Sequence, residues 1–301
     1  MMAKEKENKQ EVVSSPPTGM QVIWREFKKD KVALVSLIGL IITIVAIFVT
    51  AYFLLDQEKV MHVSLRDMYA PPGPDHWLGA DVGGRDIFGQ LIIGAKNSLL
   101  IAFFVTLVTG VFGIFVGLVC GYFGGWIDNV FMRIIDFFIT IPQLMIIIVT
   151  LTIIPKFNVI SFVLIISVFG WTGAARLIRS KALSESRRDY VNASKTLGTN
   201  DFVIIVKEII PNLSSIIIVD MTLALAGNIG IETGLSFLGF GFPSDTPSLG
   251  TLVSFARSPL VIEKYWWVWL PASLLILFLM LGINYVGQAL RRAADVRQRL
   301  G

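Results

Sequence analysis

The sequence has little charge and almost no cysteine or histidine. Of its 301 residues, 16% are Asp, Glu, Lys or Arg, and one cysteine and two histidines are present. Cys120 is alone, so it cannot form an intrachain disulfide, and its apolar neighbours favour a packed thiol. His62 and His76 have no cluster of other ligands around them in the sequence, and we assign no metal site.

Motifs of the common catalytic classes are also missing. There is no Gly-x-x-x-x-Gly-Lys-Ser/Thr loop, so the chain is not expected to hydrolyse ATP. A Gly-x-Ser-x-Gly elbow, a His-Glu-x-x-His pair and paired cysteines are absent as well. We therefore expect no enzyme and no cofactor in this chain, and the energy for any transport must come from a partner.

Long apolar runs dominate what is present. The chain is 54% hydrophobic, with a mean hydropathy of +0.70, far above a soluble domain. A membrane span needs about 20 apolar residues. Windows of this kind predict an all-α polytopic membrane protein with six transmembrane helices: 32–55, 98–127, 134–154, 157–175, 213–233 and 265–290.

The basic residues are distributed unevenly between the loops. If the amino terminus is inside, 19 of the 26 Lys and Arg lie in inside segments. The positive-inside rule then predicts that both termini and the 189–212 interval are cytoplasmic.

The 189–212 interval, called the knob below, is polar but has helical periodicity. Its first half repeats at helical spacing up to Gly198, and 199–201 can cap a second helix that Pro211 closes. The repeating residues of the first half are Tyr190, Ala193, Ser194 and Leu197, and those of the second half are Phe202, Ile205, Val206, Ile209 and Ile210. The pattern predicts two short helices that form an angled projection outside the membrane.

The knob resembles the glutamate-alanine-alanine loop in the membrane subunits of binding-protein-dependent ABC importers. Ala193, Gly198 and Pro211 match that pattern, whereas Asn192 replaces the usual Glu and Ser194 the second Ala. The resemblance implies that the knob docks on an ATP-hydrolysing subunit; a loop that packs only on its own membrane domain is the alternative. The coupling residues it implies are Asp189, Tyr190, Asn192, Ala193, Ser194, Leu197, Gly198, Phe202, Ile209 and Pro211.

Two further runs resemble the C-type permease subunit of oligopeptide and dipeptide importers. One run is 76–81 followed by 84–86. The resemblance implies that this run contacts a partner permease or the binding protein; a lid that packs on its own membrane domain is the alternative. The other is 232–241 followed by 247–250, whose glycines and prolines predict an irregular external segment. Between the two runs, the pattern of 87–95 predicts a short amphipathic helix along the membrane surface.

Several intramembrane features have local interpretations. Gly113, Gly117 and Gly121 recur at four-residue spacing and predict close helix packing. Arg133 and Asp136 lie on one helical face and can neutralise each other. Farther along that span, the proline at 142 predicts a kink.

The fifth span carries an ionisable residue at depth. Asp220 lies about 12 Å beyond Asn212 along a helix. We expect its face to line a translocation path or to meet a partner subunit; a protonated Asp220 bonded to a neighbouring helix is the alternative. The residues assigned to this path or interface are Asp220, Ala224, Gly227, Asn228 and Glu232.

The resemblance implies a division of the chain and a set of partners. The parts are a tail (1–31), a first span (32–55), an external segment (56–97), a permease core (98–290) with a coupling loop at 181–212, and a tail (291–301). The partners are a second homologous permease, two ATPases that bind ATP and Mg, and an external peptide-binding protein. The implied function is oligopeptide import; alternatives are dipeptide or nickel import, or a self-contained channel or ion-coupled transporter.

Overall fold

The computed structural model describes residues 24–154, 158–242 and 246–300. These residues form helices joined by connections of which 68–86 is the longest, and their only β-pairing is one isolated bridge between Ala80 and Asp86. The first half contains α2 Lys31–Phe53, α3 Gln57–Val60, η1 Leu65–Asp67, α4 Ile87–Phe123, α5 Gly125–Thr140, α6 Gln143–Ile153, α7 Val159–Gly170 and α8 Thr172–Glu185. The second half contains α9 Asp189–Thr196, α10 Asp201–Ile204, η2 Ile205–Ile209, α11 Ile210–Leu238, α12 Leu249–Ser254, η3 Phe255–Arg257, α13 Pro259–Lys264 and α14 Trp266–Leu300. The predicted all-α class is confirmed.

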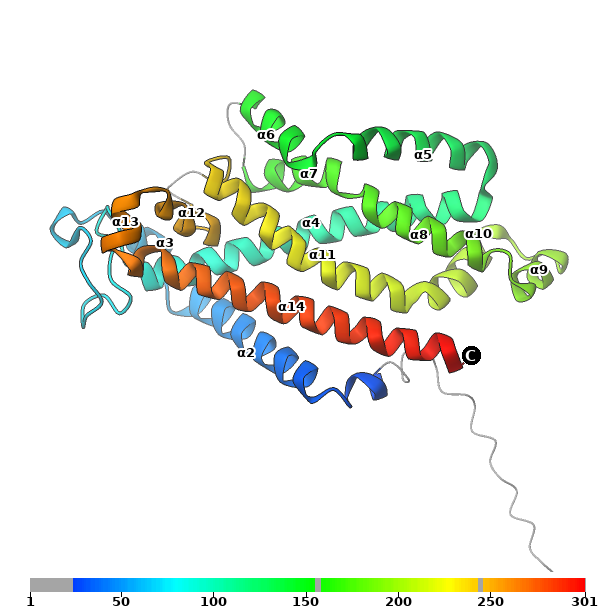
Figure 1. Cartoon of the computed structure of the whole chain (residues 1–301), viewed down its shortest axis with the longest axis horizontal. Helices are drawn as coiled ribbons and strands as arrows, with labels where there is room; N and C mark the ends of the chain where they lie inside the picture. The colour runs from blue at the N-terminus through cyan, green and yellow to red at the C-terminus, as the bar shows by residue number, and fades with distance from the viewer. Residues whose placement is uncertain (1–23, 155–157, 243–245, 301) are drawn as a thin grey trace, which may run out of the picture.

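The long helices lie side by side along one axis (Figure 1). By length and composition, 4 helices can each cross a membrane, and two bent pairs raise the number to 6 if each pair is one span. The bent pairs are α5 with α6, at 82°, and α7 with α8, at 44°. The six-span count and the orientation of the termini therefore stay predictions.

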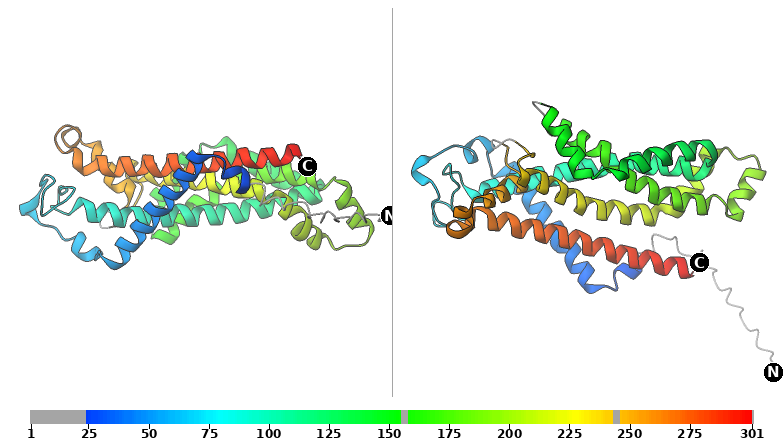
Figure 2. Two further views of the ribbon diagram at one scale, coloured as in Figure 1. Left: turned by 90° about the horizontal axis from the view of Figure 1, so that it is seen from below. Right: turned by 45° about the horizontal axis from the view of Figure 1, so that its top comes forward.

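Helix α2 packs along α14 at the edge of the bundle (Figure 2). The Asp30 carboxylate accepts a hydrogen bond from the backbone N–H of Ala33 at 3.0 Å, which caps the helix. Arg292 of α14 donates to the same carboxylate at 2.8 Å. The Ala33 N–H and the Arg292 guanidinium together hold the pKa of Asp30 below its usual value. The start of the first span is thus tied to the end of the last one.

The predicted surface helix over 87–95 is wrong, because α4 runs unbroken from Ile87 to Phe123. Asp86 caps α4 by accepting from the backbone N–H of Gly89 at 2.7 Å. No proline occurs in α4, and Ile87 and Ala95 are buried in the main apolar cluster. The apolar stripe that suggested a membrane-surface helix is instead the buried face of the outer turns of α4.

The glycines of α4 bring it into direct contact with α8, as predicted. A Cβ on Gly117 would stand 2.7 Å from the carbonyl oxygen of Ala175, and one on Gly121 would stand 2.7 Å from the Cβ of Ala182. Only glycine leaves room for this approach, so these residues set the spacing of the two helices.

The predicted pairing of Arg133 with Asp136 is wrong. Asp136 accepts a hydrogen bond from Arg176, and Asp128 accepts two from Arg179. Both arginines lie on α8, so the acids of α5 bind a neighbouring helix in preference to their own. At Pro142 the predicted kink is a full break, since α5 ends at Thr140 and α6 begins at Gln143. The connection between the predicted spans 134–154 and 157–175 lies outside the described residues.

Helix α11 is longer than the sequence indicated at both ends. Pro211 does not close the knob: the π-helical turn η2 leads directly into α11, whose first turn contains Pro211. At the end of η2 the backbone N–H of Ile210 donates to the carbonyl of Ile205, five residues back, whereas the spacing in an α-helix is four. This wider turn accommodates the ring of Pro211, which follows directly. At the other end, 232–238 is helical, and the chain leaves the helix only at Gly239, where φ is +92°. Helix α14 likewise continues past Arg291.

Candidate functional site

The knob projects beyond the ends of α4, α8 and α11 (Figure 1). Helix α9 ends as predicted before Gly198, which has a φ of +81° that a side chain with a Cβ adopts at a cost. Asn200 then caps α10 by accepting from the backbone N–H of Phe202 at 2.9 Å. The two helices and the glycine between them match the sequence prediction, whereas the end at Pro211 does not.

The base of the knob is built into the apolar core. Val191, Ile204 and Ile209 have no exposed surface. They belong to one cluster with Leu118 of α4 and Ile178 of α8. Ile209, which the resemblance counted among the coupling residues, therefore supports the knob from within. The sequence analysis missed the role of Val191.

Hydrogen bonds lock the same base. The Tyr190 hydroxyl donates to Glu185 at 2.8 Å and accepts from Asn212 at 3.0 Å. Ser194 donates to Glu208 at 2.7 Å, which joins α9 to η2. Burial, followed by the hydrogen bond to Glu185, raises the pKa of Tyr190 to about 12.

A second lock connects the knob to the end of α4. The Tyr122 hydroxyl donates to Asp201 at 2.5 Å, and the Lys195 ammonium lies 4.4 Å from the centre of the Tyr122 ring. One aromatic residue of α4 thus holds both short helices. No sequence pattern indicated this contact, because Tyr122 and Asp201 are far apart in the chain.

The tip of the knob is apolar and exposed. Leu197 is 86% exposed and Phe202 is 72% exposed. Asp189, Asn192 and Ala193 are also exposed. On the face predicted from the sequence, Tyr190 and Ser194 contact the base of the knob, whereas Ala193 and Leu197 are exposed. A fixed base under two bare apolar side chains is suited to insertion into a groove of another protein.

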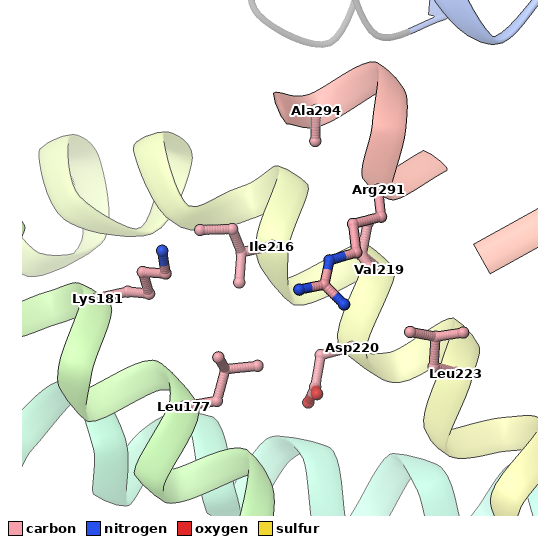
Figure 3. A pocket seen from close by; sticks show the side chains of 8 residues that line it. All are labelled: Leu177, Lys181, Ile216, Val219, Asp220, Leu223, Arg291 and Ala294. Atoms are coloured by element: carbon pink, nitrogen blue, oxygen red, sulfur yellow. The ribbon is translucent and has the colours of Figure 1, made fainter. Parts of the chain in front are cut away.

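Two cavities meet along α11. The outer cavity, of about 230 Å³, lies between α4, the α7–α8 bend and α11, and Asp220, Ala224 and Asn228 line it. The inner cavity, of about 200 Å³, lies between α8, α11 and α14, and Lys181, Asp220 and Arg291 line it. Figure 3 shows these three charged side chains pointing into the inner cavity from three different helices.

Each predicted residue of the α11 face has a distinct environment. Asp220 is bordered by both cavities and has no hydrogen bond or ion pair with any described residue. The structure therefore shows no bond of the kind that the alternative interpretation of Asp220 requires. Asn228 donates to Thr106 of α4 at 2.9 Å. Gly227 is exposed, with open space where a Cβ would stand.

Glu232 is separate from these cavities. It has no exposed surface, and its carboxyl group accepts from Ser98 at 2.8 Å and from Ser236 at 2.9 Å. Ser248, at the start of α12, also bonds to it. The geometry favours an anchor at the outer end of the bundle over the predicted place in a path.

The long apolar helices and the projecting knob define a class of protein: a polytopic helical membrane protein. Residues 113–300 match the family described as binding-protein-dependent transport system inner membrane component. Residues 18–72 match the N-terminal TM domain of oligopeptide transport permease C. The chain belongs to this family of inner membrane permeases.

Named relatives extend over nearly the whole chain. The oligopeptide transport system permease protein OppC of Lactococcus lactis subsp. cremoris is 50% identical, over 92% of this chain and 94% of the relative. OppC of Mycobacterium bovis is 35% identical over the same shares. The dipeptide transport system permease protein DppC of Bacillus subtilis is 34% identical, over 93% of this chain and 86% of the relative. The chain is thus a multi-pass permease subunit of an ABC transporter in the inner membrane, and it is not an enzyme.

Proposed function

We propose that this chain is the permease subunit of an ATP-driven importer that moves oligopeptides into the cell. The observation that carries the proposal is the knob, whose exposed Leu197 and Phe202 stand on a base fixed by Tyr122 and Tyr190. A rigid base is required because a docking element that bends cannot transmit a movement to the spans.

The proposed assembly contains three kinds of partner. Two cytoplasmic ATPases hold ATP and Mg and receive the knob, a second homologous permease completes the path, and an external binding protein delivers the peptide. Closure of the ATPases moves the knob, and the spans reorient between outward and inward access. Such coupling requires that the ATPases contact the knob differently in their two states.

Peptide cargo is favoured by the named relatives. The oligopeptide permease of Lactococcus lactis is 50% identical to this chain, whereas the dipeptide permease of Bacillus subtilis is 34% identical. An ion-coupled transporter is expected to have many charged residues within its spans. The predicted spans of this sequence have one charged face, which favours a subunit that relies on partners.

The proposal is tested at Gly198. Gly198→Pro fixes φ near −65° in place of +81°, so the knob cannot form, whereas Gly198→Asn keeps a residue that tolerates the left-handed region. Each variant is co-expressed with its ATPases and second permease, purified, and assayed in vesicles, with the binding protein added, for ATPase activity and tripeptide import. Import at least tenfold lower in the proline variant, with near-normal import in the asparagine variant, is expected.

A different outcome points to another class of protein. If the wild-type chain purifies alone and conducts solute without ATP, a self-contained channel replaces the importer. Normal ATP-driven import by Gly198→Pro would instead remove the knob from the mechanism.

A further inference from the structure

Asp220 stands between two cavities of different charge. Among the described residues that line the outer cavity it is the only charged one, whereas the inner cavity also receives Lys181 and Arg291. Within the described part of the chain, none of these three side chains has a hydrogen bond or ion pair. Figure 3 shows that they nevertheless face the same space from α8, α11 and α14.

An unpaired carboxylate at this depth is expensive, and such residues commonly face a functional cavity. The outer cavity is negative, so it complements a cation. The two basic residues make the inner cavity positive, which opposes entry of the same cation from the outer cavity. With Asp220 ionised, the outer cavity therefore suits a cationic group better than the inner cavity does.

The other lining groups of the outer cavity are small or are neutral hydrogen-bonding groups. Thr106, Thr109 and Asn228 supply hydroxyl and amide groups, and Gly173 leaves open space where a side chain would stand. The two threonine hydroxyls already donate to backbone carbonyls of α4, and the Asn228 amide donates to Thr106. The Thr109 hydroxyl oxygen and the Asn228 carbonyl oxygen can still accept hydrogen bonds from the main chain of a peptide. The open volume beside Gly173 does not demand one particular side chain from a ligand.

We propose that the outer cavity binds the amino-terminal ammonium group of the cargo peptide through Asp220. This assignment rests on the proposed function and adds a contact inside the membrane. The ammonium group is the one cation that every peptide with a free amino terminus carries, whatever its side chains. Recognition of this group lets a single site serve peptides of many sequences.

Local charge is tested first, without any need for transport. Ala224, one helical turn beyond Asp220, lines the outer cavity, and Cys120 is the one native cysteine. Ala224→Cys is made in a Cys120→Ala chain, within the assembled transporter in detergent. The new cysteine is labelled with trimethylammonium-ethyl methanethiosulfonate or with sulfonato-ethyl methanethiosulfonate. Each labelling rate is divided by the rate at which the same reagent reacts with a free thiol in solution.

The cationic reagent is expected to react about tenfold faster than the anionic one. Asp220→Asn should abolish this preference, whereas Thr222→Ala, on the same helix but outside both cavities, should keep it. A preference that survives Asp220→Asn would overturn the proposal.

Ligand protection tests the peptide itself. Trialanine should slow labelling of Ala224→Cys, N-acetyl-trialanine at the same concentration should not, and Asp220→Asn should remove the protection. Equal protection by the two peptides would overturn the assignment of the ammonium group. If charge preference and protection hold but vesicles import no peptide under ATP, the proposed function fails and the binding site stands.

Discussion

The two ends of the molecule, called inner and outer after the predicted orientation, each carry a family-like motif, yet the two motifs are exposed to opposite degrees. At the inner end, Leu197 and Phe202 are bare, at 86% and 72% exposure. At the outer end, Glu232 has no exposed surface and bonds to serines of α4, α11 and α12. The inner motif leaves two large apolar side chains uncovered, whereas the outer motif holds its own chain together.

Backbone contacts show the same division. At the outer end the backbone N–H of Leu249 donates to Ser98 at 3.0 Å, and Asn97 donates to the carbonyl of Pro247 at 2.8 Å. At the inner end, a Cβ on Gly198 would have no described atom within 4 Å, so space does not require glycine there and its φ of +81° does. The outer motif is therefore held by contacts with α4, whereas the inner motif depends on the backbone conformation of one glycine.

The largest expected effect on stability is at Glu232. Glu232→Ala leaves several buried serine hydroxyls without their acceptor, at about 1–3 kcal/mol for each unsatisfied group. Glu232→Gln retains a carbonyl acceptor, and the serine hydroxyls can rotate to suit it. We expect a large fall in the melting midpoint of the purified complex for Ala and a small one for Gln. Equal losses would mean that the carboxylate charge, and not the hydrogen bonding, is needed.

A substitution at Gly250 should have the next largest effect. A Cβ there would lie 2.4 Å from the Cβ of Ser236, and the backbone of Thr233 closes the other side. Gly250→Ala should cost about 1–3 kcal/mol through overpacking. Gly198 is needed for its positive φ, which asparagine tolerates, so Gly198→Asn should be tolerated. Gly250 is needed for lack of space, so Gly250→Asn should be worse than Gly250→Ala. Thermal melting of these variants beside the wild-type chain checks this order.

Removal of the Tyr190 hydroxyl should have a moderate effect. Tyr190→Phe deletes bonds to Glu185 and Asn212 and should destabilise the knob by about 0.5–1.5 kcal/mol. Because the pKa of Tyr190 is raised to about 12 from 10.0, the stability that its neutral form contributes is full below pH 10 and is lost as pH rises toward 12. Tyrosinate absorbance titration of wild type minus Tyr190→Phe should show this late ionisation; a difference centred near pH 10 would contradict it.

The smallest effect on stability is expected at the tip. Leu197→Ala with Phe202→Ala removes side chains that are already exposed, so the melting midpoint should hardly change. ATPase recruitment should nevertheless fall at least tenfold, because the apolar anchors of the docking surface are gone. Binding of the purified ATPases to the wild-type permease and to the double variant measures this. Unchanged recruitment would separate the tip from the docking surface.

Sequence reasoning succeeded where local signals decide the structure. The end of α9 at Gly198, the cap at Asn200 and the glycine contacts of α4 follow from residues within one or two turns of each other. A helix was expected from residue 87, but its continuation into the second span was missed because its buried stripe has the same periodicity as a membrane-surface helix. Periodicity identifies an apolar face but does not tell what covers that face.

Long-range contacts were beyond local reasoning. Asp136 bonds to Arg176 on another helix, and Tyr122 bonds to Asp201 across the knob. Asp220 was identified from its depth alone, but the two cavities beside it exist only where α4, α8, α11 and α14 meet. The π-helical turn before Pro211 likewise has no simple signature, because proline usually ends a helix.

Cross-linking determines whether the tip of the knob contacts the ATPase. In a Cys120→Ala chain, Leu197→Cys is compared with Phe53→Cys, an 82% exposed residue at the other end of the bundle. Each is treated with a short thiol-to-amine cross-linker in the assembled complex, and the products are identified by mass spectrometry. We expect a product with the ATPase from Leu197→Cys and none from Phe53→Cys. A product from Phe53→Cys, with none from Leu197→Cys, would contradict this expectation.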